Sequence, residues 1–84
     1  MKYVIKESAY TYAILPKEFI ERPAYGFDYT DELNEATTFD SVMEAINALL
    51  IREVARASSI PSVDRFTIIG VKEVNQPRYE EVSL

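Results

Sequence analysis

Residues 41–57 read SVMEAINALLIREVARA, and this stretch decides the fold because it predicts one complete helix. Ser41 stands three residues before Glu44, as in a capping box, where two side chains satisfy backbone N–H groups at the start of a helix. Apolar residues then recur at helical spacing on one face, which comprises Val42, Ala45, Ile46 and Leu49. Four more widen that face: Met43, Leu50, Val54 and Ala57. A face this wide predicts that the helix packs on a sheet.

Strand patterns flank the helix on both sides. Residues 2–6 are rich in the strand formers Tyr, Val and Ile. Residues 9–15 alternate larger and smaller side chains, as a half-buried strand does. A third strand is predicted over residues 65–74, where apolar side chains occupy both faces. The two faces are Phe66 with Ile68, and Ile69 with Val71.

The order strand, strand, helix, strand predicts a single α+β domain over residues 1–84. We expect a small antiparallel or mixed sheet of about three to four strands, with the helix of about residues 41–57 packed on one face. Residues 16–37 are punctuated by proline and glycine and are expected to be irregular. Residues 75–84 are expected to form either a flexible tail or a short edge strand.

Composition excludes most enzyme classes. The chain contains no cysteine and no histidine, which removes thiolate nucleophiles, thiolate zinc sites and the most common general base. It has only two glycines, so a glycine-rich phosphate loop is excluded. The acidic residues between positions 28 and 35 lack the spacing of a calcium-binding loop. We therefore predict a protein that is not an enzyme and that has no cofactor and no metal site.

The net charge of −5 makes some classes of binding partner unfavourable. Affinity for nucleic acid comes from Lys and Arg side chains that neutralise phosphates, so direct nucleic-acid binding is disfavoured, as is an anionic membrane surface. The longest apolar run, residues 48–51, is too short to span a bilayer, and the expected location is the cytoplasm. The core of so short a domain is thin, so a homodimer or higher oligomer is kept open as a source of further stability.

One segment is both acidic and aromatic. Residues 23–51 contain no Lys or Arg. A surface of one charge sign with aromatic side chains suits docking onto a basic groove of another protein, and a groove that normally holds nucleic acid would be blocked by such a mimic. The candidate partner-binding residues are Tyr25, Phe27, Asp28, Tyr29, Asp31, Glu32 and Glu35. The alternative is a solvated acidic loop whose aromatic side chains cover the end of the sheet.

A second candidate surface is basic. Arg52 and Arg56 are four residues apart on the predicted helix, and Arg65 precedes the last predicted strand. Together they could bind a small anionic ligand, including one held across a dimer interface, because the guanidinium group pairs with phosphate through two hydrogen bonds. The alternative is that these cations form ordinary surface pairs with neighbouring carboxylates, which contribute little stability.

Several segments of the sequence, which span most of the chain as far as Val74, resemble segments of a known group of proteins. They are MKYVIK at residues 1–6, GFDYT at 26–30, ELNEATTFDS at 32–41 and Glu44-Ala45. In this the chain resembles small bacteriophage-encoded accessory and anti-defence proteins of anti-CRISPR-like, β-β-α-β type. The resemblance implies a non-enzymatic inhibitor that binds a host defence protein in the host cytoplasm, and it brings no catalytic residues. The alternatives are a homo-oligomeric sponge for a small anionic signal molecule, or a structural or assembly protein.

Overall fold

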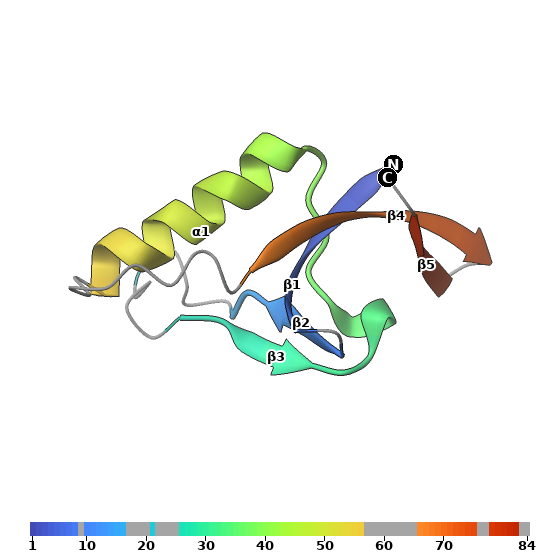
Figure 1. The fold of residues 1–84 in the computed structure, drawn as a ribbon, viewed down its shortest axis with the longest axis horizontal. Helices are drawn as coiled ribbons and strands as arrows, with labels where there is room; N and C mark the ends of the chain where they lie inside the picture. The colour runs from blue at the N-terminus through green and yellow to red at the C-terminus, as the bar shows by residue number, and fades with distance from the viewer. Residues whose placement is uncertain (9, 17–20, 22–25, 57–65, 76–77, 83–84) are drawn as a thin grey trace.

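The computed structural model describes residues 1–8, 10–16, 21, 26–56, 66–75 and 78–82. The elements follow one another as β1 (Lys2–Ser8), β2 (Thr11–Ile14), β3 (Asp28–Thr30), the short 3₁₀ helix η2 (Leu33–Glu35), α1 (Val42–Arg56), β4 (Thr67–Asn75) and β5 (Arg78–Val82). The helix lies across one face of the sheet, and η2 lies away from it (Figure 1). None of the helices in these ranges has the length and apolar character that a membrane span requires.

The five strands of the described chain form one antiparallel sheet in the order β3-β2-β1-β4-β5. The prediction of an α+β fold is confirmed, but the prediction of three to four strands is wrong. The strand that the sequence pattern missed is β3, which is only three residues long and lies within the segment expected to be irregular. Its pairing with β2 stabilises it, from Tyr12 opposite Thr30 to Ile14 opposite Asp28. Of the two predictions for the C-terminal segment, the edge strand is the one observed, as β5.

The helix begins and ends within one residue of the predicted bounds. The Ser41 hydroxyl accepts the backbone N–H of Glu44 at 3.1 Å, as predicted. The Glu44 carboxylate accepts the N–H of Asp40 at 2.9 Å, one residue before the cap itself. Both ends of the capping box therefore satisfy donors at the helix start, which explains why this boundary could be read from the sequence.

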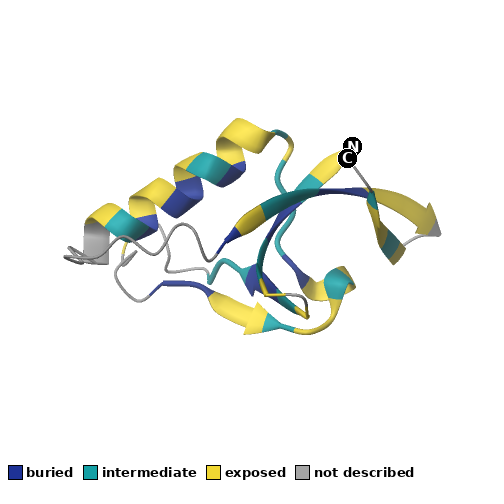
Figure 2. Ribbon diagram, viewed as in Figure 1, coloured by how far each residue is buried: buried dark blue, intermediate teal, exposed yellow. Residues whose placement is uncertain are grey.

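The predicted packing face of the helix is only half right. The buried side chains are Ala45, Ala48, Leu49 and Arg52. Five apolar side chains lie exposed instead: Val42, Met43, Leu50, Ile51 and Val54. Because Ala45 and Ala48 are small, they allow the helix backbone to lie close to the sheet and leave the larger residues beside them facing outward. Figure 2 shows this exposed side of α1 facing away from the sheet.

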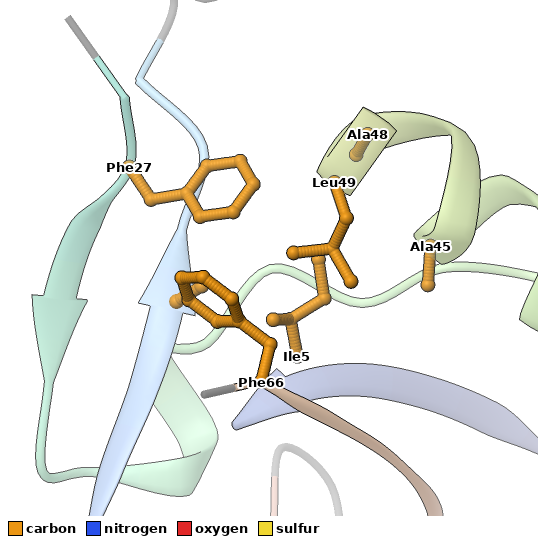
Figure 3. Packing of buried hydrophobic residues seen from close by; sticks show 7 residues of the cluster. Ile5, Phe27, Ala45, Ala48, Leu49 and Phe66 are labelled. Carbon is orange, nitrogen blue, oxygen red and sulfur yellow. The ribbon is translucent and has the colours of Figure 1, made fainter. Parts of the chain in front are cut away.

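A first hydrophobic cluster fills the space between α1 and the sheet. Its buried members are Ile5, Ala13, Phe27, Ala45, Ala48, Leu49 and Phe66 (Figure 3). The rings of Phe27 and Phe66 meet edge to face, with centroids 6.0 Å apart and planes at 82°. This geometry is the favourable one for aromatic pairs. The cluster therefore ties β1, β2, the segment before β3 and the start of β4 to the helix.

A second cluster lies on the opposite face of the sheet. It comprises Val4, Tyr12, Ala36 and Val71, with Leu33, Ile69 and Tyr79 packed against it. The prediction that residues 65–74 form a strand with two covered faces is therefore confirmed, since Ile68 contacts the first cluster and Ile69 the second. The cover on this second face comes from η2 and β5, which also meet through a hydrogen bond of 2.7 Å from the Tyr79 N–H to Asn34 Oδ1.

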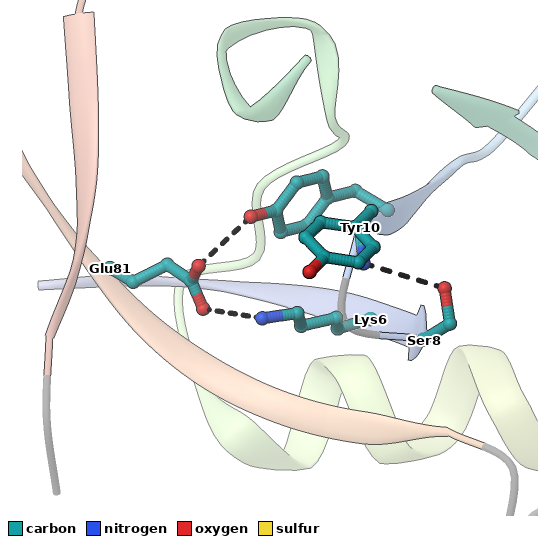
Figure 4. A network of polar contacts seen from close by, with 5 residues as sticks. Lys6, Ser8, Tyr10 and Glu81 are labelled. Atoms are coloured by element: carbon teal, nitrogen blue, oxygen red, sulfur yellow. Dashed lines mark hydrogen bonds and ion pairs between the residues drawn. The ribbon is translucent and has the colours of Figure 1, made fainter. Parts of the chain in front are cut away.

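A polar network holds β5 against the neighbouring strands. Glu81 accepts a hydrogen bond of 2.9 Å from the Lys6 ammonium and another of 2.9 Å from the Tyr12 hydroxyl (Figure 4). The bond from Lys6 is the main reason that the pKa of Glu81 lies below its ordinary value of 4.5, and burial opposes the shift. Burial, followed by the bond to Glu81, raises the pKa of Tyr12.

This network predicts an acid-dependent loss of stability. Because the pKa of Glu81 is lower in the folded chain than in the unfolded chain, its contribution is fully present above about pH 4.5 and is lost as the pH falls through the folded value. The side chain is partly exposed, so we expect a change of no more than about 1 kcal/mol. The free energy of unfolding, measured with urea between neutral and acidic pH, should depend less steeply on pH in Glu81→Gln than in the wild-type chain. An unchanged pH dependence of the free energy of unfolding would contradict this role of Glu81.

Candidate functional site

The acidic residues gather where β3 leads into η2, at one edge of the sheet. Asp28, Asp31, Glu32 and Glu35 are all exposed there, and so is Tyr29. We call these five residues the acidic corner. Asp28 and Tyr29 lie on the edge strand β3, and Asp31, Glu32 and Glu35 follow in the turn and η2 that come directly after it.

Local hydrogen bonds hold the backbone of the acidic corner. The Thr30 hydroxyl accepts the N–H of Glu32 at 3.0 Å and lies 3.1 Å from Glu35 Oε2, to which it can donate. The N–H of Glu35 donates to the carbonyl of Glu32 at 3.0 Å. Below this turn, Leu33 and Ala36 pack into the second cluster. The carboxylates therefore project from an anchored turn, which lowers the entropy lost when a partner binds.

Three cations of the described chain form ion pairs outside the acidic corner. Lys2 pairs with Asp40, Lys6 with Glu81 and Arg52 with Glu53. None of these ion pairs includes a carboxylate of the acidic corner, so the negative charge there is not neutralised by a described Lys or Arg within salt-bridge distance. The hydrogen bond and the charge of Lys2 lower the pKa of Asp40. This ion pair ties Asp40, which precedes α1, to strand β1.

The structure corrects one predicted contact residue and leaves another open. Phe27 is buried and packs against Phe66 in the first cluster, so it belongs to the core rather than to a binding surface. Gly26, immediately before it, has φ 77°, a backbone conformation that glycine adopts without strain. Tyr25 lies outside the described residues. Of the predicted aromatic contacts, Tyr29 is the one that the structure shows exposed.

Arg52 is not available at a ligand surface. Its side chain is 3% exposed, and its guanidinium carbon lies 5.5 Å from the ring centroid of Phe27 and 5.1 Å from that of Phe66. Nη1 donates to Glu53 Oε1 at 2.5 Å, and Nε has no hydrogen-bond partner among the described residues. The guanidinium group is therefore part of the core. Of the other predicted ligand residues, the side chain of Arg56 and all of Arg65 lie outside the described part of the chain.

The hollows of the described surface are shallow. One, of about 310 Å³, is lined by Lys6, Glu7, Ser8, Thr67 and Ile69. Another, of about 250 Å³, is lined by Met1, Lys2, Val71, Lys72, Glu73 and Tyr79. Within the described ranges, no three carboxylates converge as a metal ion would require. Neither of these two hollows is lined by a residue of the acidic corner.

Comparison with known proteins adds no information about this candidate site. No protein-family model, no curated protein and no solved structure matches the chain.

Proposed function

We propose that this chain is a non-enzymatic binding protein whose acidic corner docks onto a basic surface of a partner protein. The observation that carries the proposal is the set of exposed carboxylates with no described cation in ion-pair contact: Asp31, Glu32 and Glu35 in one anchored turn, and Asp28 on the adjoining strand β3. A cluster of one charge sign attracts a basic partner over several ångströms and speeds their encounter.

The chemistry of the corner indicates what the partner surface contains. Carboxylates accept paired hydrogen bonds from Arg side chains, and an exposed Tyr provides a rigid aromatic contact. A basic groove that binds nucleic acid offers both Arg and Lys. The resemblance to phage-encoded anti-defence proteins supports a bacterial host protein with such a groove as the partner, and inhibition by competition as the result.

Reversing the charge of the corner should abolish most of the binding. For the double variant Asp31→Lys/Glu32→Lys we expect an affinity about 10- to 100-fold lower, because attraction to a basic surface becomes repulsion. We also expect a weaker dependence on salt. The tagged variant and the wild-type chain would be used to capture proteins from bacterial lysate, quantified by mass spectrometry, followed by titration of the purified partner at two salt concentrations.

A matched control separates the site from overall charge. Glu73→Lys/Glu80→Lys makes the same change in net charge on β4 and β5, where both side chains are exposed. We expect this control to bind within about threefold of the wild-type chain, because these two charges are screened by salt and lie outside the proposed contact residues. If both double variants lost binding equally, the acidic corner would not be the contact surface.

The sponge alternative gains no support from the described residues. It needs arginine side chains converging on an anion, yet the guanidinium group of Arg52 is buried against the rings of Phe27 and Phe66 and paired with Glu53. The carboxylate of Glu53 beside it would repel a phosphate. We therefore propose no second function.

A further inference from the structure

The outward side of α1 is unusually apolar for a helix exposed to water. Its exposed residues within the described part are Val42, Met43, Glu44, Asn47, Leu50, Ile51 and Val54, and Glu44 alone among them is charged. Met43 is 62% exposed, Leu50 52% and Val54 79%. The exposed side of a helix that packs on one sheet is normally charged or polar. A contiguous exposed apolar surface of this kind marks an interaction site.

The spacing of these residues is that of a helix-pairing seam. Met43, Asn47, Leu50 and Val54 are separated by four, three and four residues, the alternation by which one helix packs along another. We call these four residues the outer stripe. It lies on the side of α1 opposite to Ala45, Ala48 and Leu49, which contact the sheet. Since no described element covers these side chains, a second helix can pair with the outer stripe without disturbing the core.

We infer that the outer stripe is the contact through which two copies of this chain associate, with their α1 helices side by side and parallel. Asn47, in the middle of the stripe, is the residue that selects a second copy. Its amide carries both donors and an acceptor, so two Asn47 side chains facing each other satisfy one another. A single buried Asn in such a seam is the common device for specifying a parallel pair.

The antiparallel arrangement is less favourable. It would place Asn47 opposite Leu50 of the other copy and bury an amide against an apolar side chain, which leaves the amide without its hydrogen bonds. In the parallel arrangement, Ile46 of one helix flanks Ile51 of the other. Contacts at the edges of the seam are then apolar on both sides.

The charges of the two copies are compatible with this pairing. Each chain carries a net charge of −5, but the four residues of the outer stripe are uncharged. The acidic corner packs on the second cluster, on the opposite face of the sheet from α1. The inference is independent of the proposed function, since the dimer contact and the acidic corner do not share a residue.

The size of the contact sets its expected strength. A pair of helices of this length buries on the order of 1,000 Å², the low end for stable protein–protein contacts. We therefore expect reversible association with a dissociation constant on the order of 10–100 µM. Sedimentation of the wild-type chain from about 10 µM to about 1 mM should show conversion of monomer to dimer. A chain that stays monomeric throughout this range would overturn the inference.

One charge placed in the stripe should separate the two copies. Leu50→Glu is expected to weaken association at least about tenfold, because two carboxylates would meet at the seam. The matched control Val74→Glu adds the same charge at an apolar side chain on β4 that is 43% exposed, and should leave association unchanged. Circular dichroism checks the fold, and Val54→Glu replaces Leu50→Glu if that variant unfolds. Association that persists in the folded stripe variants, or that is lost in the control, would overturn the assignment of the face.

The absence of cysteine allows a direct test of the register. In Asn47→Cys the one thiol of each chain should face its copy, so mild oxidation should yield a disulfide-linked dimer in high yield. The control Val74→Cys should remain largely monomeric on the same timescale. Equal yields from both variants would overturn the parallel pairing at Asn47.

Discussion

Replacing Arg52 with alanine should lower the free energy of unfolding by about 3 kcal/mol, as breaking a buried ion pair does. The truncation removes the guanidinium group that lies over the rings of Phe27 and Phe66, and it removes the charge that faces Glu53. Cation–π contacts contribute further when the cation is desolvated, as it is here. Urea unfolding followed by circular dichroism measures the loss. For a domain of this size it should lower Tm by roughly 12–24 °C.

The methionine variant separates packing from charge. Arg52→Met keeps most of the side-chain volume and removes Nε, the buried donor that has no partner. Arg52→Met still removes the partner that faces Glu53, so we expect a loss smaller than that of the alanine variant but not zero. The double variant Arg52→Met/Glu53→Gln removes both charges, and replacing both members of a buried ion pair is often close to neutral, so we expect it to lose about 1 kcal/mol or less. A methionine variant as unstable as the alanine variant would show that the charge of Arg52 is essential. Alanine and methionine variants as stable as the wild-type chain would contradict its place in the core.

Truncating Ile5 to alanine should be the most destabilising change within the sheet, with a loss of about 3–4 kcal/mol. Ile5 is fully buried in β1, the central strand, and lies opposite Ile68 of β4. Leucine and isoleucine truncations of this kind leave a cavity that rigid neighbours fill only in part. Since a domain of this length has a total stability of about 4–13 kcal/mol, we expect a large fraction of the variant to be unfolded at 37 °C.

Ile51→Ala is the matched control for this prediction. It makes the same chemical change on α1, where the side chain is 43% exposed. We expect a loss below about 1 kcal/mol, because little apolar surface is returned to water and alanine favours a helix. The unfolding of both variants should be measured in dilute solution, where association through the outer stripe is negligible. Equal losses for the two variants would contradict the burial of Ile5 against the helix.

Features with a strong local signal could be read from the sequence. The capping box at Ser41 and Glu44 predicted the start of α1 to within one residue, because the side chains that satisfy a helix end are close neighbours in sequence. The two apolar faces of β4 were equally visible, since side chains alternate along any strand. The acidic run was evident as well, and four of its predicted carboxylates are exposed at one corner.

Other features depend on how the elements pack. The strand β3 is only three residues long, so its pairing with β2 defines it rather than its own composition. Phe27 belonged by sequence to an acidic, aromatic run, yet the packing of the segment before β3 buries it against Phe66. Arg52 could be placed on the helix but not in the core, because the two rings that it contacts come from segments distant in sequence.

The sequence by itself determined the fold class, the bounds of the helix, the two-faced strand β4 and the acidic character of the segment before the helix, because each depends on residues that are close in the chain. Only the tertiary structure decided which side of α1 faces the sheet. Helical spacing offers more than one apolar side, and the small residues Ala45 and Ala48 allow the closest approach to the sheet. The outer stripe was left exposed by that choice, since a side chain can be buried only where another element covers it.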